Sequence, residues 1–294
     1  MRFDLVVLDF DGTFTDAEAE AGPFLRAYRQ AAEAWLEARG VVDAAGAWEA
    51  EGARLEAAPE AYGWRWEGRI VAPGGVDPYL RASVIMSALL DAHSLLPEPA
   101  PRRGLLQRLY ASCYVASKTV FRPDARAVVE ALLASPATVA VVTNSATDAV
   151  REKLATLAPR GQEHLRVYGD AEKYVVTPAE PPDGRFDGLP DTVAAPGLDR
   201  PVFLRRGRYY ETLRALWETT GTTPERTLVA GDIYELDLAL PAALGAAVQL
   251  VGKARTMSYE RAAVRALERG RDDDRLSALL ERVGLSAPAS AASA

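Results

Sequence analysis

The chain has 294 residues, 49% of them hydrophobic, which is enough to bury a substantial core and is typical of two domains. Its 34 basic and 41 acidic residues give a net charge of −7, so the composition implies no general surface for binding nucleic acid. The single cysteine, Cys113, excludes an intramolecular disulfide and a thiolate metal cluster.

Two features of the sequence bear on where the protein works. A strand is predicted to begin within a few residues of Met1, which leaves no room for a signal peptide. No apolar run approaches the length of a membrane span, so we expect no membrane partner. We therefore expect the protein to work in a reducing cytoplasm.

The first predicted element is a buried strand over residues 6–8, which ends in the sequence Asp9-Phe10-Asp11-Gly12-Thr13. Side chains alternate along a strand, so Asp9 and Asp11 should leave the backbone in roughly the same direction. Two carboxylates crowded at the end of a buried strand are costly unless they bind a cation or share a proton. A helix-capping Asp before a turn explains either acid alone, but it fits the whole sequence poorly.

The sequence from Asp9 to Thr13 resembles the first motif of the haloacid dehalogenase superfamily, whose members are mostly Mg²⁺-dependent phosphatases. The resemblance covers roughly the two ends of the chain. It implies that Asp9 is the nucleophile and that Asp11 is the general acid and base. It also implies that the Asp9 carboxylate and the backbone carbonyl of Asp11 help to bind Mg²⁺.

Residues 17–118 are predicted to form an all-helical cap, inserted between two parts of an α/β core, 1–16 and 119–285. The tail 286–294 has low complexity and is expected to be disordered. Helical spacing or helix-favouring composition marks four stretches of the cap: about 24–36, 43–58, 80–89 and 105–116.

One segment of the cap, residues 62–69, is predicted to be a loop because glycines bound it. It carries two tryptophans and two arginines, a poor composition for a simple connector. We expect Trp64 and Trp66 to face one way and stack on a substrate, and Arg65 or Arg69 to meet a second anionic group. The alternative is that the tryptophans pin the loop to the cap helices.

After residue 119, apolar strands alternate with helices, which predicts a doubly wound, Rossmann-like parallel sheet. Residues 178–200 are rich in Pro, Gly and Asp and are predicted to form a long loop or a small excursion. Further strands are expected at residues 138–142, 165–168, 174–177, 227–230 and 246–251, and a closing helix at 273–283.

Two polar segments follow predicted strands. After 138–142 come Thr143 and Asn144, whose hydroxyl and backbone N–H groups can hold a phosphoryl oxygen, although a helix cap is the alternative. After 227–230 comes Asp232, which by the resemblance completes the Mg²⁺ site. Asp237 is expected to bond metal-bound water or the cationic residue, unless it is only an acid at a helix N-terminus.

The family also places a lysine about 25 residues before the metal aspartate, near the phosphoryl group. Counting back from Asp232 leads to Gly207, which lies between Arg206 and Arg208. No lysine occurs between Lys173 and Lys253. We expect Arg206 to be the cation, with Lys173 or Arg208 as the alternatives.

The expected function is Mg²⁺-dependent hydrolysis of a small phosphorylated metabolite through an aspartyl-phosphate on Asp9. Asp11 argues against a dehalogenase, because a departing halide needs no proton. The alternatives are a sugar phosphomutase, a phosphonate hydrolase, and a catalytically weak protein that binds a phosphate ligand. A phosphonate hydrolase would need a cap lysine, and Lys118, the only lysine before residue 119, lies at the predicted hinge. The substrate and the oligomeric state are left open.

Overall fold

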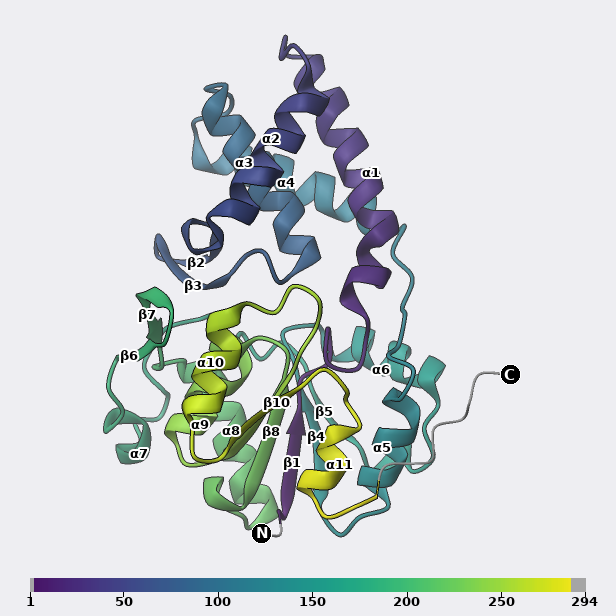
Figure 1. The fold of residues 1–294 in the computed structure, drawn as a ribbon, viewed down its shortest axis with the longest axis vertical. Coiled ribbons are helices and arrows are strands. Elements are labelled where there is room, and N and C mark those ends of the chain that lie inside the picture. Colours follow the sequence, from purple (N-terminus) through teal and green to yellow (C-terminus); the bar gives the residue numbers. More distant parts are fainter. Residues whose placement is uncertain (1–2, 287–294) are drawn as a thin grey trace. The chain divides into compact units, whose positions relative to one another are not determined.

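A computed structural model of the protein describes residues 3–286 (Figure 1). The chain forms two compact units. The core unit combines the segment up to residue 16 with the segment from residue 121 onward, and the insertion comprises residues 17–120. The predicted tail, 286–294, lies outside the described residues except for Ser286.

The described part of the core unit is built on a parallel sheet with the strand order β10-β9-β8-β1-β4-β5 (Figure 1). The chain adds β4 and β5 on one side of β1 and then returns to add β8 on the other. The end of β1 therefore lies where the strand order reverses, the place at which such sheets bind ligands. The predicted doubly wound parallel sheet is confirmed. Its strands are β1 (Leu5–Leu8), β4 (Thr138–Val142), β5 (Arg166–Tyr168), β8 (Thr227–Gly231), β9 (Ala247–Val251) and β10 (Gly270–Asp273).

Helices cover both faces of this sheet (Figure 1). Alternate residues of β1 serve the two faces: Leu5 and Val7 pack with the helices of one side, Val6 and Leu8 with those of the other. This double burial explains why the central strands are continuous apolar runs. One face carries α8 (Gly207–Thr220), α9 (Ala239–Ala243) and α10 (Ser258–Ala266), and the other α5 (Ala125–Leu133), α6 (Thr147–Leu157) and α11 (Ala278–Arg282).

Residues 178–200 form a small excursion, one of the two predicted forms, and two other segments of the core unit differ from the prediction. Residues 178–200 contain a short helix, α7 (Gly184–Asp187), and most of an antiparallel hairpin, β6 (Thr192–Ala195) and β7 (Leu198–Phe203). The strand predicted at 174–177 is wrong, since only one isolated bridge, from Thr177 to Arg206, forms there. The helix predicted at 273–283 is shorter and is preceded by strand β10, whose polar sequence concealed it.

The insertion packs its helices around a separate apolar cluster that includes Phe24, Tyr28, Leu36 and the buried Cys113. Its helices are α1 (Ala17–Glu37), α2 (Ala44–Ala57), α3 (Pro78–Ala92) and α4 (Pro99–Tyr114). Even α1, with 21 residues, lacks the apolar character of a membrane span, as do the other helices within residues 3–286.

The predicted loop at 62–69 is instead a β-hairpin, formed by β2 (Gly63–Trp66) and β3 (Arg69–Pro73). The insertion is therefore helical with one hairpin. Gly63 permits the strands to approach, because a Cβ atom at this position would lie 2.2 Å from the carbonyl oxygen of Ala72. A glycine that suggested a loop in the sequence is thus required by the strand pairing.

Candidate active site

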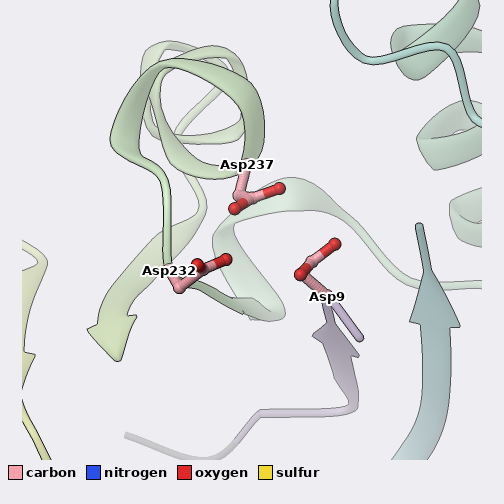
Figure 2. A group of neighbouring side chains, drawn as sticks. All are labelled: Asp9, Asp232 and Asp237. Atoms are coloured by element: carbon pink, nitrogen blue, oxygen red, sulfur yellow. The ribbon is translucent and has the colours of Figure 1, made fainter. Parts of the chain in front are cut away.

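Three aspartates from separate segments meet at the C-terminal edge of the sheet (Figure 2). Asp9 follows β1, Asp232 follows β8, and Asp237 belongs to a π-helical turn, Tyr234–Leu238. Their side chains point toward one another in Figure 2, and one carboxylate oxygen of each lies within 4.8 Å of the others. The parallel pairing of β1 with β8 brings the three residues together, since it ends both strands at the same edge.

Two glycines allow this close approach. Gly12 has a φ of +85°, and a Cβ atom there would lie 2.2 Å from Oδ2 of Asp232. A Cβ atom at Gly231 would lie 2.4 Å from the Cβ of Asp237. A side chain at either position would push one carboxylate out of the group.

The three carboxylates are buried, with exposed fractions of 8% for Asp9, 2% for Asp232 and 3% for Asp237. Burial raises the pKa of Asp9 well above its usual range, and the charges of Asp237 and Asp232 raise it further, against the opposing effect of Lys173. Burial likewise raises the pKa of Asp232, which the contacting ammonium of Lys253 opposes. The three buried carboxylates can all stay ionised only if cations lie beside them.

Lys173 is the cation that lies against Asp9. Its Nζ donates to Oδ1 of Asp9 at 2.7 Å and to Oδ1 of Asp237 at 2.8 Å, and the residue is only 1% exposed. Burial disfavours its charge, but the carboxylates of Asp237 and Asp9 more than compensate and raise the pKa of Lys173 above its usual value. Lys173 is therefore a fixed, protonated cation beside the predicted nucleophile.

Arg206, expected from its spacing to be that cation, lies elsewhere. Its side chain is fully buried and donates to the backbone carbonyls of Lys173, at 2.7 Å, and Phe203, at 3.0 Å. It therefore holds the segment that carries Lys173, whose own ammonium lies against Asp9. Arg208 is more exposed and pairs with Glu172 at 3.7 Å. Spacing to Asp232 pointed to Arg206, whereas the cation bonded to Asp9 is Lys173, which enters the site from the loop after β5.

Asp11 is outside the group of three acids. Its Oδ2 accepts a hydrogen bond from the hydroxyl of Ser145 at 2.6 Å, and its Oδ1 is 3.0 Å from Nζ of Lys153. Neither Ser145 nor Lys153 was predicted to take part in the site. Ser145 directly follows the predicted Thr143-Asn144 pair, which is a signal that could have indicated it, whereas Lys153 on α6 left none.

Thr143 and Asn144, expected to hold a phosphoryl oxygen, make bonds within the protein. The hydroxyl of Thr143 accepts the backbone N–H of Ser145 at 3.2 Å. The side-chain oxygen of Asn144 accepts the backbone N–H of Lys173 at 2.7 Å. Asn144 and Arg206 thus fix Lys173 from the two sides of its backbone, through its N–H and its carbonyl.

A second group of polar residues supports the turn that carries Asp237. Glu235, fully buried, accepts two hydrogen bonds from Arg200, both at 2.6 Å, and one from the hydroxyl of Tyr259 at 2.7 Å. Tyr209 donates its hydroxyl to the backbone carbonyl of Asp237 at 2.8 Å. Hairpin β6–β7, α10 and α8 therefore all hold this turn, a role that nothing in the sequence indicated.

The donor set of the site fits a hard divalent cation. Buried carboxylate oxygens from Asp9, Asp232 and Asp237 are the ligand type that Mg²⁺ prefers, and no softer His or Cys donor belongs to the group within residues 3–286. The raised pKa values of Asp9 and Asp232 also fit a cation, because crowded anions without one would take up protons.

The predicted substrate contacts of the insertion lie on its hairpin. Trp64 pairs with Ala72 and Trp66 with Arg69 across the two strands. Both tryptophans are partly buried, whereas Arg69 is exposed and lies 3.2 Å from Glu67. The hairpin thus gives these side chains a defined backbone setting, which a loop would not.

Comparisons with known proteins agree with this architecture. A family model for haloacid dehalogenase-like hydrolases matches residues 3–245. The HAD-hydrolase YfnB of Bacillus subtilis, in a structure bound to magnesium, is similar over 97% of this chain and all of its own, with 13% identity and a TM-score of 0.54. A predicted phosphoglycolate phosphatase of Haemophilus somnus matches 96% of this chain and 98% of its own, with 15% identity and a TM-score of 0.53. A search of curated proteins found no match.

Proposed function

The chain belongs to the haloacid dehalogenase-like hydrolases, and from this premise we propose that it is a Mg²⁺-dependent phosphatase of a small phosphorylated metabolite. The observation that carries the proposal is the setting of Asp9. This carboxylate is buried, is bonded to the fixed cation Lys173, and belongs to a group of three acids suited to a divalent metal. A nucleophile beside cations suits attack on phosphorus, where negative charge must be neutralised.

In the proposed reaction, a carboxylate oxygen of Asp9 attacks phosphorus in line, and the bond from phosphorus to the ester oxygen breaks. Asp11 gives its proton to the departing alkoxide. Water then attacks the aspartyl-phosphate and loses a proton to Asp11, which releases phosphate and restores Asp9. Lys173 keeps Asp9 in place and offsets charge on the phosphoryl oxygens. Mg²⁺, held by Asp9, Asp232 and the backbone carbonyl of Asp11, would supply further neutralisation of that charge.

Asp11 favours phosphate esters over halogenated acids as substrates. An alkoxide is a strong base and leaves readily only when it receives a proton, whereas a halide leaves without one. A carboxylate two residues after the nucleophile supplies that proton. Trp64 and Arg69 on the hairpin of the insertion are the proposed contacts that select the leaving group, since the chemistry at Asp9 is common to all phosphate esters.

The test is phosphate release from a panel of phosphorylated metabolites and p-nitrophenyl phosphate, with and without MgCl₂. We expect Mg²⁺-dependent turnover that Asp9→Asn abolishes, because the amide has the same shape but is a poor nucleophile. Asp148→Asn is the matched control, since this aspartate on α6 is 92% exposed. Halide release from 2-haloacids without phosphate release would contradict the proposal, and release of neither product would favour a protein that only binds a phosphate ligand.

A further inference from the structure

The Asp11 carboxylate is bound at both of its oxygens, by donors from two other segments. Ser145 lies in the loop after β4 and donates its hydroxyl to Oδ2 at 2.6 Å. Lys153, on α6, donates to Oδ1 at 3.0 Å. We propose that Ser145 and Lys153 are positioning residues that hold Asp11 for its two proton transfers. The inference rests on the proposed phosphatase function.

Lys153 is itself held firmly by its surroundings. It lies on α6, whose residues Val150, Leu154 and Leu157 pack into the apolar layer on one face of the sheet. Its side chain is 15% exposed, and Nζ lies 5.8 Å from the ring centroid of Phe10. The helix that carries this ammonium is thus fixed to the same sheet that carries Asp9 and Asp11.

Binding at two oxygens restricts both the position and the rotation of a carboxylate. One donor alone leaves the group free to turn about the bond to its Cβ atom, and two donors from different segments remove that freedom. A carboxylate has about four lone-pair sites, so two donors leave sites for a proton or a water molecule. Asp11 can therefore exchange protons while Ser145 and Lys153 continue to hold it.

The contacts of Ser145 and Lys153 with Asp11 should matter for the reaction rate and little for the stability of the fold. The side chain of Asp11 is 36% exposed, and ion pairs at such positions contribute little to the stability of a fold. A general acid must lie within hydrogen-bond reach of its partner, and a misplacement of about 1 Å can cost about 10²-fold in rate. Loss of the pair should therefore affect the rate far more than the melting temperature.

The experiment compares Lys153→Met, Lys153→Arg and Ser145→Ala with the wild type on two substrates, an alkyl phosphate and p-nitrophenyl phosphate. Nitrophenolate leaves without protonation, so only the alkyl ester needs Asp11 in its first step. The ratio kcat/KM reports only the steps up to departure of the leaving group, and the later hydrolysis of the aspartyl-phosphate is common to both esters. We expect Lys153→Met to lower kcat/KM for the alkyl ester about 10–10²-fold, with a much smaller loss of kcat/KM on nitrophenyl phosphate. Lys153→Arg should restore part of the loss, and Ser145→Ala should show the same selectivity more weakly.

Arg151→Met is the control, because Arg151 lies on the same helix and is 63% exposed. Melting temperatures of all variants should match the wild type within a few degrees. Equal losses of kcat/KM on both substrates, or no loss of kcat/KM on either, would overturn the inference while leaving the phosphatase assignment intact. If the wild type hydrolyses neither ester, both proposals fall together.

Discussion

Lys173 and Arg206 are two buried cations with different tasks, although they lie next to each other in space. The ammonium of Lys173 contacts the carboxylates of Asp9 and Asp237. The guanidinium of Arg206 contacts backbone carbonyls, one of them that of Lys173 itself. Arginine suits the second task because its planar group binds several acceptors at once, whereas the compact ammonium of Lys173 donates to two separate carboxylates.

These contacts predict different consequences of removing each cation. Lys173→Met should abolish phosphate release, since Asp9 and the transferring phosphoryl group both lose their fixed counter-charge. Arg206→Met should lower the melting temperature, because it leaves buried carbonyls without donors, and it should lower activity less than Lys173→Met does. Parallel measurements of kcat and thermal unfolding separate the two effects. An inactive Arg206→Met with unchanged melting temperature, beside an active Lys173→Met, would return the catalytic role to Arg206.

At the scale of single elements, the strands that are buried on both faces could be predicted from the sequence. The strands β1, β4, β8 and β9 are buried on both faces, so their apolar runs stood out in the sequence. Strand β10 has the sequence Gly-Arg-Asp-Asp and lies at the edge of the sheet, where polar side chains are tolerated, so no pattern revealed it. Hairpin β2–β3 was concealed by its glycines, which suggested a loop.

Hairpin β2–β3 of the insertion is predicted to determine which phosphate esters the enzyme accepts. If it reads the substrate, Trp64→Ala and Arg69→Ala should each change the relative kcat/KM values across a panel of phosphate esters, with little change in melting temperature. Arg103→Ala is the matched control, because Arg103 is an exposed arginine of the insertion that lies on α4, outside the hairpin. A fall of several degrees in melting temperature with equal losses on every ester would make the hairpin structural.

At the scale of the whole molecule, residues distant in the sequence form the site because parallel strands end at one edge of the sheet. Asp9 and Asp232 could be predicted, because each directly follows a buried strand. Lys173 could not be singled out, since it lies in an irregular segment that Asn144 and Arg206 fix by tertiary hydrogen bonds. Sequence periodicity indicates strands and helices, but it does not indicate bonds between loops.

The central claim is that Asp9 becomes phosphorylated during turnover, and an acid-quench experiment tests it most directly. Asp11→Asn is mixed with p-nitrophenyl phosphate and MgCl₂, quenched in acid, and examined by intact-protein and peptide mass spectrometry. Nitrophenolate can leave without Asp11, but water attack on the intermediate needs a base, so the phosphoryl-enzyme should accumulate. We predict one added phosphoryl group, located on Asp9 and absent from the Asp9→Asn/Asp11→Asn double variant. A phosphoryl group on another residue, or continued turnover in the double variant, would contradict the account.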